Sequence, residues 1–374
     1  MKPKKALPQQ IDLVLLYLII GMVAFGYLIF TSASLGLLAR DGASFETVAL
    51  NQFLFGIIGG GLALFITSSI HYRHWRQFAF YIFGATLLLT AAVFIPGLGM
   101  IHGGATRWLN LGITTVQPSE LLKIGFVVYL ATWLSGVHHQ LNDWRYGLLP
   151  VVCTIGIVGV LLLQQPDTGT FLIIAGTGMV MYLVSGAPWK HIVFLVIAGL
   201  VGIAVIAFVR PYVLDRITTF LDPDSDPLGS RYQIQQSLIA VGSGGVAGRG
   251  FGQSIQKFDF LPEPIGDSIF AVYAEEFGFL GVTVLLSALI ALALRGYKTA
   301  VQAKDLFGTL LVTGFITIIT AQAFLNITAM IGLVPLSGLP LPFISHGGTA
   351  LLTTLAALGI VLNVSKYRTR GSRA

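Results

Sequence analysis

Long apolar runs separated by short charged segments dominate this chain, and their spacing predicts a bundle of membrane-spanning helices. A helix needs about 20 apolar residues to cross the hydrocarbon core of a bilayer. The chain offers about ten such runs, so we expect an all-α polytopic membrane protein. The predicted spans cover residues 11–33, 48–70, 78–96, 119–135, 147–164, 168–186, 190–209, 267–294, 306–333 and 343–364. Two of them, 267–294 and 306–333, are long enough to tilt or to project beyond the membrane.

One long polar segment, residues 210–266, separates the seventh predicted span from the eighth. No other connection is as long or as charged. It ends in Leu-Pro-Glu-Pro-Ile-Gly-Asp at 261–267, which places Asp267 where the polar surface meets the next apolar run. Ionisable groups at such a boundary are costly to hold and are therefore candidates for a functional site.

The distribution of basic residues predicts the orientation of the chain. Ten spans place both termini on one side of the membrane, and 14 of the 22 basic residues fall on that side. Positive charge favours the cytoplasmic side, so the tails 1–10 and 365–374 are predicted to be cytoplasmic and the 210–266 loop external. The net charge of +6 follows from this bias and indicates no nucleic-acid partner. With 55% hydrophobic and 10% charged residues, we expect a single transmembrane domain over 1–374.

Two polar motifs surround the start of the fourth predicted span. Arg107 and Trp108 lie in the preceding external connection, where the guanidinium could clamp a phosphate or the indole could anchor the chain at headgroup level. Gln-Pro-Ser-Glu-Leu-Leu-Lys follows at 117–123 and is typical of a helix start, with proline in the first turn. Glu120 and Lys123 could pair, because a lysine this deep in a span needs a partner or a watery cavity.

Further polar groups lie on the predicted external side. Asp167 precedes Thr-Gly-Thr, a pattern typical of a helix cap or a turn. Residues 231–239 are compatible with a helix in which Gln236 and Ser237 are interleaved with apolar residues. The glycine-rich stretch at 242–252 could present backbone amides to phosphates or could provide flexibility alone.

Three acidic residues open the eighth predicted span. Asp267 could cap the helix, or its pKa could be raised at that depth so that it serves as a base. Glu275 and Glu276 lie two turns further in, where carboxylates must face protein or water, so we expect an arginine or lysine partner.

The last two spans carry their own polar features. Gln322 and Asn326 are four residues apart and are predicted to hydrogen-bond between helices. Residues 338–348 read Gly-Leu-Pro-Leu-Pro-Phe-Ile-Ser-His-Gly-Gly and predict an irregular external segment before the tenth helix. Backbone of this kind is tolerated at membrane depth where it is buried in protein or lines a cavity.

Taken together, these motifs resemble the SEDS family of shape, elongation, division and sporulation proteins (FtsW/RodA). The resemblance covers nearly the whole chain, and the polar loop followed by Asp267 is its most specific part. The matching motifs include Ser32-Ala33-Ser34, Arg107-Trp108-Leu109, Gln117-Pro118-Ser119-Glu120 with Lys123, Gln165-Pro166-Asp167, Leu221-Asp222-Pro223, Asp226-Pro227-Leu228-Gly229, Tyr232-Gln233, Gln236-Ser237, Leu261-Pro262-Glu263, Glu275-Glu276 and Gly338-Leu339-Pro340-Leu341-Pro342-Phe343. Gln256-Lys257 and the 338–345 string are more similar to the division branch, that of FtsW, than to the elongation branch.

Two positions depart from the family's pattern. His346 stands where the family usually carries an aromatic hydroxyl, and Ile265-Gly266 replaces the usual polar pair before the catalytic aspartate. Because both concern the surroundings of Asp267, we expect its local hydrogen bonding to differ from the family's.

The resemblance implies a peptidoglycan glycosyltransferase that polymerises lipid II on the outer face of the cytoplasmic membrane and releases polyprenyl diphosphate. Asp267 would then be the catalytic general base. The candidate substrate-binding residues are Arg107, Trp108, Gln117, Ser119, Glu120, Lys123, Asp167, Arg216, Arg231, Gln236, Ser237, Glu263 and His346. The cations among them could neutralise the diphosphate. The carboxylates could position sugars, hold those cations or bind a divalent metal such as Mg or Mn.

The resemblance also implies partners: a class B penicillin-binding transpeptidase, with other division proteins and membrane lipids around it. Two other functions fit parts of the sequence. A lipid II flippase would suit the intramembrane Glu120–Lys123 and Glu275–Glu276 pairs, but alternating access requires a midplane site gated from both sides, whereas the polar residues gather on one face. A non-catalytic scaffold for the transpeptidase would leave the external charges without a role.

Overall fold

Each of the ten predicted spans is occupied by helix in the computed structural model, which describes residues 10–39, 45–102, 105–110, 112, 115–209, 211–221, 230–258 and 260–368. The helices that fill the spans are α1 (Leu13–Ser34), α2 (Phe45–Asn51) continued by a π-helical stretch (Gln52–Gly59) and α3 (Gly60–Ser69), α4 (Tyr72–Ala92), α5 (Pro118–Gly136), α6 (Leu148–Gln164), α7 (Thr168–Val184), α8 (Trp189–Val209), α11 (Ile269–Val301), α12 (Leu306–Met330) and α13 (Gly348–Ser365). The expected all-α polytopic fold is confirmed.

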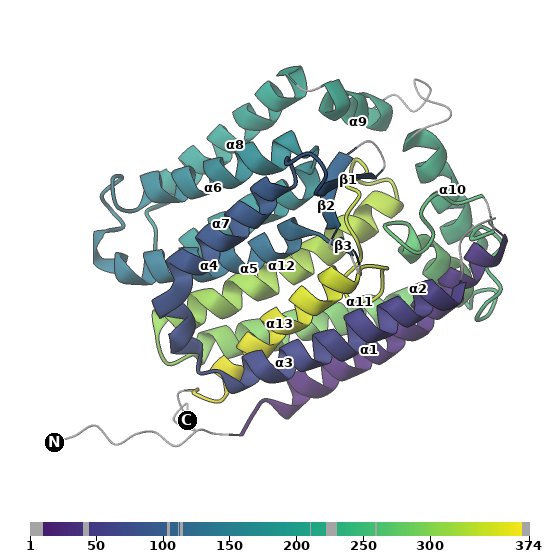
Figure 1. Cartoon of the computed structure of the whole chain (residues 1–374), viewed down its shortest axis with the longest axis horizontal. Helices are drawn as coiled ribbons and strands as arrows, with labels where there is room; N and C mark the ends of the chain where they lie inside the picture. Colours follow the sequence, from purple (N-terminus) through teal and green to yellow (C-terminus); the bar gives the residue numbers. More distant parts are fainter. Residues whose placement is uncertain are drawn as a thin grey trace.

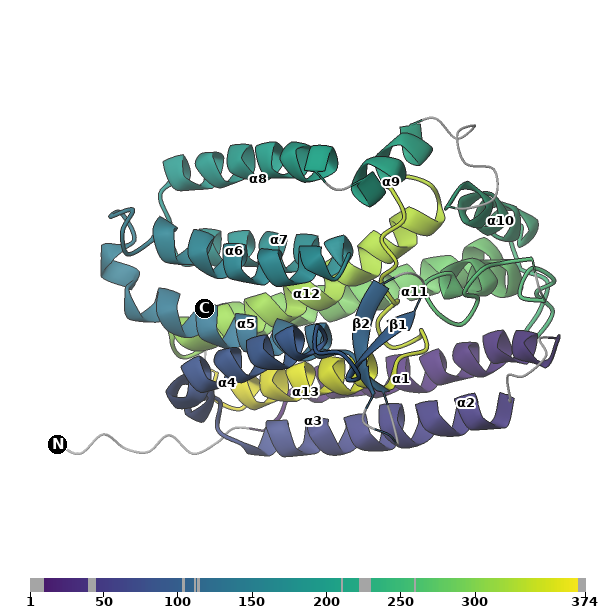
Figure 2. The same cartoon turned by 45° about the horizontal axis from the view of Figure 1, so that its top comes forward.

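The long helices lie side by side in one bundle (Figures 1 and 2). Within the described part of the chain, 6 helical segments are long and apolar enough to cross a membrane, and α6 and α7 are shorter apolar helices. The most enclosed of the six is α12, which packs against α5, α7 and α11, whereas α8 lies at the edge of the bundle with most of its surface exposed. The chain is therefore a multi-pass membrane protein.

The start of α1 and the end of α13 lie at the same end of the bundle, as an even number of spans requires (Figure 1). Asp12 joins them: its carboxylate pairs with Arg295 of α11 at 2.8 Å and with Arg368, beyond α13, at 3.0 Å. A second ion pair at 2.8 Å joins Arg73 of α4 to Asp305 before α12. Acids at this end are thus neutralised by the basic residues that predict a cytoplasmic face.

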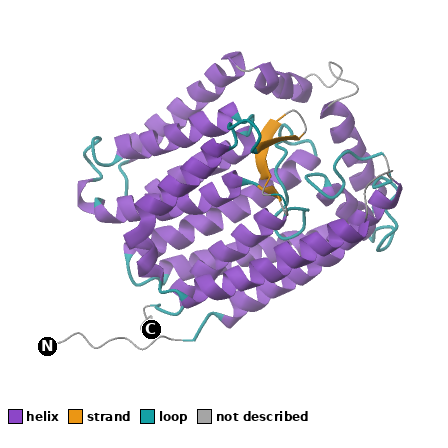
Figure 3. Ribbon diagram, viewed as in Figure 1, coloured by secondary structure: helices purple, strands orange, loops and turns teal. Residues whose placement is uncertain are grey.

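The opposite end of the bundle carries the polar connections. The connection before α5 forms a small antiparallel sheet of β1 (Gly99–His102), β2 (Ala105–Asn110) and β3 (Thr115–Val116), which the sequence analysis did not predict (Figure 3). Beside it lie two helices of the long loop, α9 (Pro211–Leu221) and α10 (Ser230–Ser243). The predicted helix at 231–239 is contained in α10.

Part of the polar segment lies outside the described residues. Within this segment, Arg210, Asp259 and the aspartate-rich motif at 222–229 are not described. The chain ends 1–9 and 369–374 also lie outside the described residues.

Helix α11 is longer than predicted and is broken at Gly278, whose φ of 61° lies in the left-handed region. The N–H groups of Phe279 and Leu280 donate to the loop carbonyls of residues 245 and 246 instead of continuing the helix. The carbonyls of Glu275 and Glu276 in turn accept hydrogen bonds from the backbone at 249 and 250. A Cβ at Gly278 would lie 2.3 Å from the Gly248 nitrogen, so only glycine fits this contact.

Candidate active site

Asp267 lies in the turn that joins the long polar loop to α11. Its Oδ1 accepts a hydrogen bond of 3.1 Å from Nε2 of Gln233 on α10, and the same amide is 2.9 Å from Ser268 Oγ. The interpretation of Asp267 as the helix cap is wrong. Ser268 occupies the cap position, and its side chain makes no cap bond. The carboxylate of Asp267 is therefore available for chemistry rather than committed to the helix terminus.

The surroundings of Asp267 raise its pKa from the ordinary 3.8 to about 6. Burial is the largest cause, because it disfavours the ionised form, and the neighbouring carboxylate of Glu263 adds to it. The hydrogen bond from Gln233 and the charge of Arg216 act in the opposite direction. A carboxylate with this pKa is mostly ionised near neutral pH yet basic enough to accept a proton.

Two arginines converge on the backbone of Gly338, and the charge of one of them, Arg216, also acts on Asp267. A Cβ built on Gly338 would lie 3.9 Å from Nη2 of Arg216 on α9 and 4.0 Å from Nη1 of Arg107 on β2. Arg107 is oriented by the turn before α7, where it donates to the carbonyl oxygens of Gln165, at 3.2 Å, and of Pro166. The absence of a side chain at Gly338 leaves space between the two guanidinium groups.

Asp167 completes this turn as the predicted helix cap. One of its carboxylate oxygens accepts a hydrogen bond of 3.3 Å from the backbone N–H of Thr170, while the other, Oδ2, is buried without a hydrogen-bond partner. Asp167 and Arg107 are thus brought together around the same turn, on the side of the molecule that carries Asp267.

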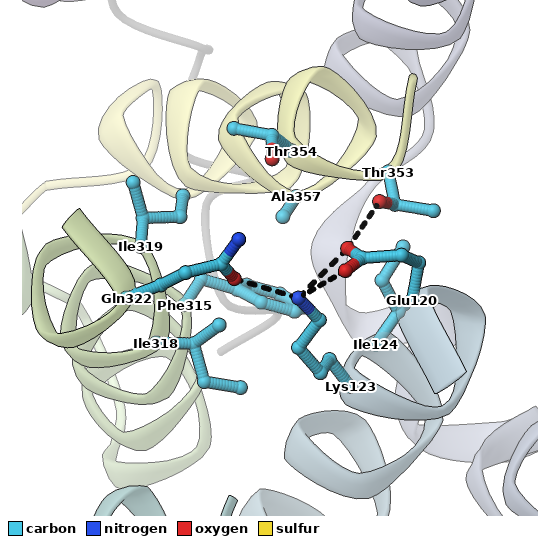
Figure 4. Close-up of a pocket in the computed structure, with 10 residues that line it drawn as sticks. All are labelled: Glu120, Lys123, Ile124, Phe315, Ile318, Ile319, Gln322, Thr353, Thr354 and Ala357. Carbon is cyan, nitrogen blue, oxygen red and sulfur yellow. Dashed lines mark hydrogen bonds and ion pairs between the residues drawn. The ribbon is translucent and has the colours of Figure 1, made fainter. Parts of the chain in front are cut away.

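Glu120 and Lys123 form the predicted pair, at 2.7 Å, but deep among α5, α12 and α13 (Figure 4). The ammonium group also donates to Gln322 Oε1 at 2.7 Å, and Thr353 donates to the carboxylate at 3.3 Å. The amide nitrogen of Gln322 reaches the backbone oxygen of Pro340 at 2.8 Å. The pair is therefore connected through Gln322 to the irregular segment before α13, while both charged side chains are buried.

The other candidates are distributed around the same end. Gln117 precedes α5 without capping it, Ser119 is buried at its start, and Trp108 follows Arg107 on β2. Arg231, Gln236 and Ser237 lie on α10, where Ser237 Oγ donates to the Gln233 carbonyl at 2.7 Å. His346 stacks on Phe30 with ring centroids 5.8 Å apart.

A second buried ionic cluster ties the long loop to α11 and α1. Lys257 has no exposed surface, and its ammonium group lies 2.8 Å from Glu276 and 3.3 Å from Ser32 Oγ. Glu275 accepts hydrogen bonds from Ser254 Oγ and from loop backbone N–H groups, and pairs with Arg249 at 3.4 Å. The prediction that these two glutamates need a lysine or arginine partner is confirmed.

Among the described residues, no group of three histidine, cysteine or acidic side chains gathers that could hold a metal ion. Glu263 and Asp267 are near each other, but the charged group opposite them is the guanidinium of Arg216. These residues therefore do not define a ligand set for a divalent metal such as Mg or Mn, which was one of three roles left open for the carboxylates.

Several polar residues of the site escaped the list of candidates. Gln233 belongs to one of the matching family motifs, but no role was predicted for it. The only sign of Gln52 in the sequence is that an amide side chain stands inside an apolar run. Gln52 lies in the π-helical stretch, and its side chain hydrogen-bonds both the Ser345 carbonyl, at 3.3 Å, and the Gly347 N–H, at 3.2 Å. These two bonds hold the end of the segment 338–347, which we call the 338–347 loop. A π-helical insertion of this kind is frequent at functional sites.

The fold and this cluster of acid, amide and guanidinium groups define a polytopic membrane protein with a polar site at one end of its bundle. The family model described as "Cell cycle protein" for FtsW, RodA and SpoVE matches residues 12–370. The chain belongs to this family.

Relatives match over almost their whole length. Stage V sporulation protein E of Bacillus subtilis (strain 168) is 38% identical over 367 residues, covering 98% of this chain and 99% of that protein. The probable peptidoglycan glycosyltransferase FtsW of Geobacter sp. (strain M18) is 35% identical over 364 residues, covering 96% and 98%.

Two solved structures share the fold. A chain of a peptidoglycan synthase complex, described as coordinating polymerization and crosslinking, superposes with a TM-score of 0.78 at 31% identity and covers 95% of this chain and 97% of its own. The rod shape determining protein RodA of Thermus thermophilus superposes with a TM-score of 0.71 at 29% identity, covering 96% and 98%.

Proposed function

We propose that Asp267 is the general base with which this peptidoglycan glycosyltransferase polymerises lipid II. The acceptor's sugar hydroxyl gives its proton to the Asp267 carboxylate as its oxygen attacks the anomeric carbon of the donor. A glycosidic C–O bond forms, and the bond from that carbon to the polyprenyl diphosphate breaks. General base catalysis of this kind is worth about 10²–10⁴-fold in rate.

The observation that carries this assignment is the position of the Asp267 carboxylate. It lies at the boundary between the apolar α11 and the polar end, and its pKa is raised to about 6. The interaction with Gln233 fixes one carboxylate oxygen through Oδ1, which leaves Oδ2 as the atom that would take the proton.

The leaving group is assigned to the two arginines at Gly338. A diphosphate gains negative charge as the glycosyl bond breaks, and preorganised positive charge stabilises that transition state. Arg216 and Arg107 approach the same glycine from two different elements, α9 and β2. Guanidinium groups suit this role because their planar fork matches phosphate oxygens. Lys123 is paired with Glu120 inside the bundle, so we assign it to supporting the site through Gln322.

The finer biological setting follows from the relatives. We assign the external end, with Asp267 and the long loop, to the outer face of the cytoplasmic membrane, and both termini to the cytoplasm. The solved synthase complex coordinates polymerization with crosslinking, which supports a class B penicillin-binding transpeptidase as the partner of this chain. Relatives named FtsW and stage V sporulation protein E support a role in division or sporulation.

The test is Asp267→Asn, assayed for lipid II polymerisation by purified protein in detergent. Asparagine keeps the shape and can still accept the Gln233 hydrogen bond, but it cannot take the proton. We expect a loss of at least about 10²-fold with normal expression. The matched control is Asp305→Asn, because Asp305 caps α12 at the opposite end of the bundle and asparagine caps about as well as aspartate.

Wild-type turnover by Asp267→Asn would exclude this residue as the base. A lipid II flippase gives a different pattern. Detergent assays require no transfer across a bilayer, so a transport defect would disappear there, and a defect seen only in membranes would favour transport.

A further inference from the structure

The backbone at Asp267 is held by an asparagine from another helix. Asn326 of α12 is almost completely buried, and its Nδ2 donates to the carbonyl oxygen of Asp267 at 2.7 Å and to that of Leu339 at 2.7 Å. From the sequence, Asn326 was predicted to hydrogen-bond between helices. Instead it joins two non-helical segments, the turn before α11 and the 338–347 loop.

The 338–347 loop holds the two preceding carbonyls. Ser345 Oγ donates to the Gly266 oxygen at 2.7 Å and accepts from the Leu341 N–H at 2.7 Å. The N–H of His346 donates to the Ile265 oxygen at 2.7 Å. Three consecutive carbonyls, at 265, 266 and 267, are thus each bonded by a donor from outside their own segment.

The chemistry of these contacts specifies the residue types. Both neighbours of Asn326 Nδ2 are carbonyl oxygens, which can only accept, so the site requires a group with two N–H donors on one atom. An aspartate of the same shape would place carboxylate oxygens against two carbonyls. A serine or threonine hydroxyl, at position 345, both donates and accepts, which is what the contacts to Gly266 and Leu341 use.

We propose that Asn326 and Ser345 are positioning residues for the glycosyl transfer, which fix the main chain at Asp267 and thereby the direction of its carboxylate. The inference rests on the proposed role of Asp267 as the base. The two residues act on the backbone, whereas Gln233 acts on the carboxylate itself. Gln233 holds the carboxylate while Asn326 and Ser345 hold the main chain, so the side chain of Asp267 has little freedom to rotate before the acceptor hydroxyl binds.

A purely structural role makes a different prediction, and the chain contains a matched asparagine to separate the two. Asn363 of α13 is equally buried, and it also bridges backbone groups of other segments: it donates to the Ser68 oxygen and accepts from the Tyr72 N–H, both at 2.8 Å. It lies at the end of the bundle where the termini meet, away from Asp267.

The experiment compares Asn326→Leu with Asn363→Leu in detergent, measuring kcat and KM for lipid II polymerisation and thermal stability. Asn326→Leu removes the donor from two carbonyl oxygens, and Asn363→Leu removes the acceptor of the buried Tyr72 N–H and one donor of the Ser68 oxygen, so both variants should melt at lower temperature. For Asn326→Leu we expect a fall in kcat per folded molecule of up to about 10²-fold, with KM changed little, because a misplacement of about 1 Å can cost that much. For Asn363→Leu we expect the kcat of the folded fraction to equal that of the wild type.

Ser345→Ala and Ser345→Thr provide a second test that does not depend on the folding of Asn326→Leu. Alanine removes the hydroxyl and should lower kcat by about 10-fold or more, while threonine retains the hydroxyl and should recover most of it. Wild-type kcat for Ser345→Ala, or for folded Asn326→Leu, would overturn the proposal. Asp267→Asn is measured in parallel: if that variant is active, the base assignment fails, whereas an inactive Asp267→Asn with active positioning variants refutes the positioning role alone.

Discussion

The side-chain amide of Gln233, on a helix of the long polar loop, donates a hydrogen bond of 3.1 Å to the carboxylate of Asp267. This contact favours the ionised carboxylate and opposes the effects of burial and of Glu263. The loop therefore contributes to the pKa of this carboxylate.

The first prediction concerns pH. Transfer requires ionised Asp267, so activity should rise with pH to a plateau, with its midpoint near the pKa of about 6. Gln233→Leu removes a hydrogen bond that lowers this pKa, so the midpoint should move to higher pH, and activity should fall more at pH near 6 than at pH near 8. Gln235→Leu, at an exposed position of the same helix, is the control. An unchanged midpoint for Gln233→Leu would remove this residue from the proton equilibrium.

The second prediction concerns the guanidinium groups near Gly338. Arg107→Ala and Arg216→Ala should each lower kcat/KM for lipid II, because both lose positive charge next to the diphosphate. Arg107→Lys should recover only part, since the guanidinium donates to two carbonyl oxygens at once, those of Gln165 and Pro166. Arg76→Ala, at the opposite end of the bundle, controls for a general loss of charge. Full activity of both alanine variants would exclude the diphosphate clamp.

The third prediction tests the buried pair of Lys257 and Glu276. Lys257→Met leaves the carboxylate of Glu276 buried without its cation, which should cost about 3–5 kcal/mol of stability. Combining it with Glu276→Gln removes the unpaired charge and should restore much of the loss. Thermal unfolding in detergent measures both variants. If the double variant is no more stable than Lys257→Met, the pair is not the source of the stability.

The fourth prediction fixes the orientation. In a Cys153→Ala background, Gln253→Cys in the long loop should react with an impermeant thiol reagent in intact cells. Lys304→Cys, between α11 and α12 at the opposite end, should react only after permeabilisation. Both positions are exposed. The reverse pattern would contradict the predicted cytoplasmic termini.

The spans were predictable because apolar run length alone determines whether a helix can cross a bilayer. The boundaries of α4 and α11 were less accurate. Helix α4 begins at Tyr72, earlier than the apolar run, because Arg73 remains helical while its side chain reaches Asp305. The strands of the small sheet are too short for their alternation of polar and apolar residues to be distinguished, in the sequence, from an irregular loop.

The partners of charged side chains in the site could be predicted from the sequence, but the contacts of its amide side chains could not. Carboxylates such as Glu275 and Glu276 must find cations in an apolar span, so sequence alone demanded their partners. The amides of Gln52, Gln233 and Asn326 bond backbone groups that are distant in sequence. Such contacts depend on how the loops return over the bundle, and no local pattern encodes that path.

The break at Gly278 divides α11 into two helical parts. Below it the helix is embedded among apolar neighbours, and its tilt can follow changes in bilayer thickness. Four backbone hydrogen bonds fasten α11 to the loop at the break: two end on the carbonyls of residues 275 and 276 before it, and two start from the N–H groups of residues 279 and 280 after it. The loop therefore holds α11 on both sides of the break, so the segment that follows Asp267 stays aligned with the loop at the point where the helix is interrupted.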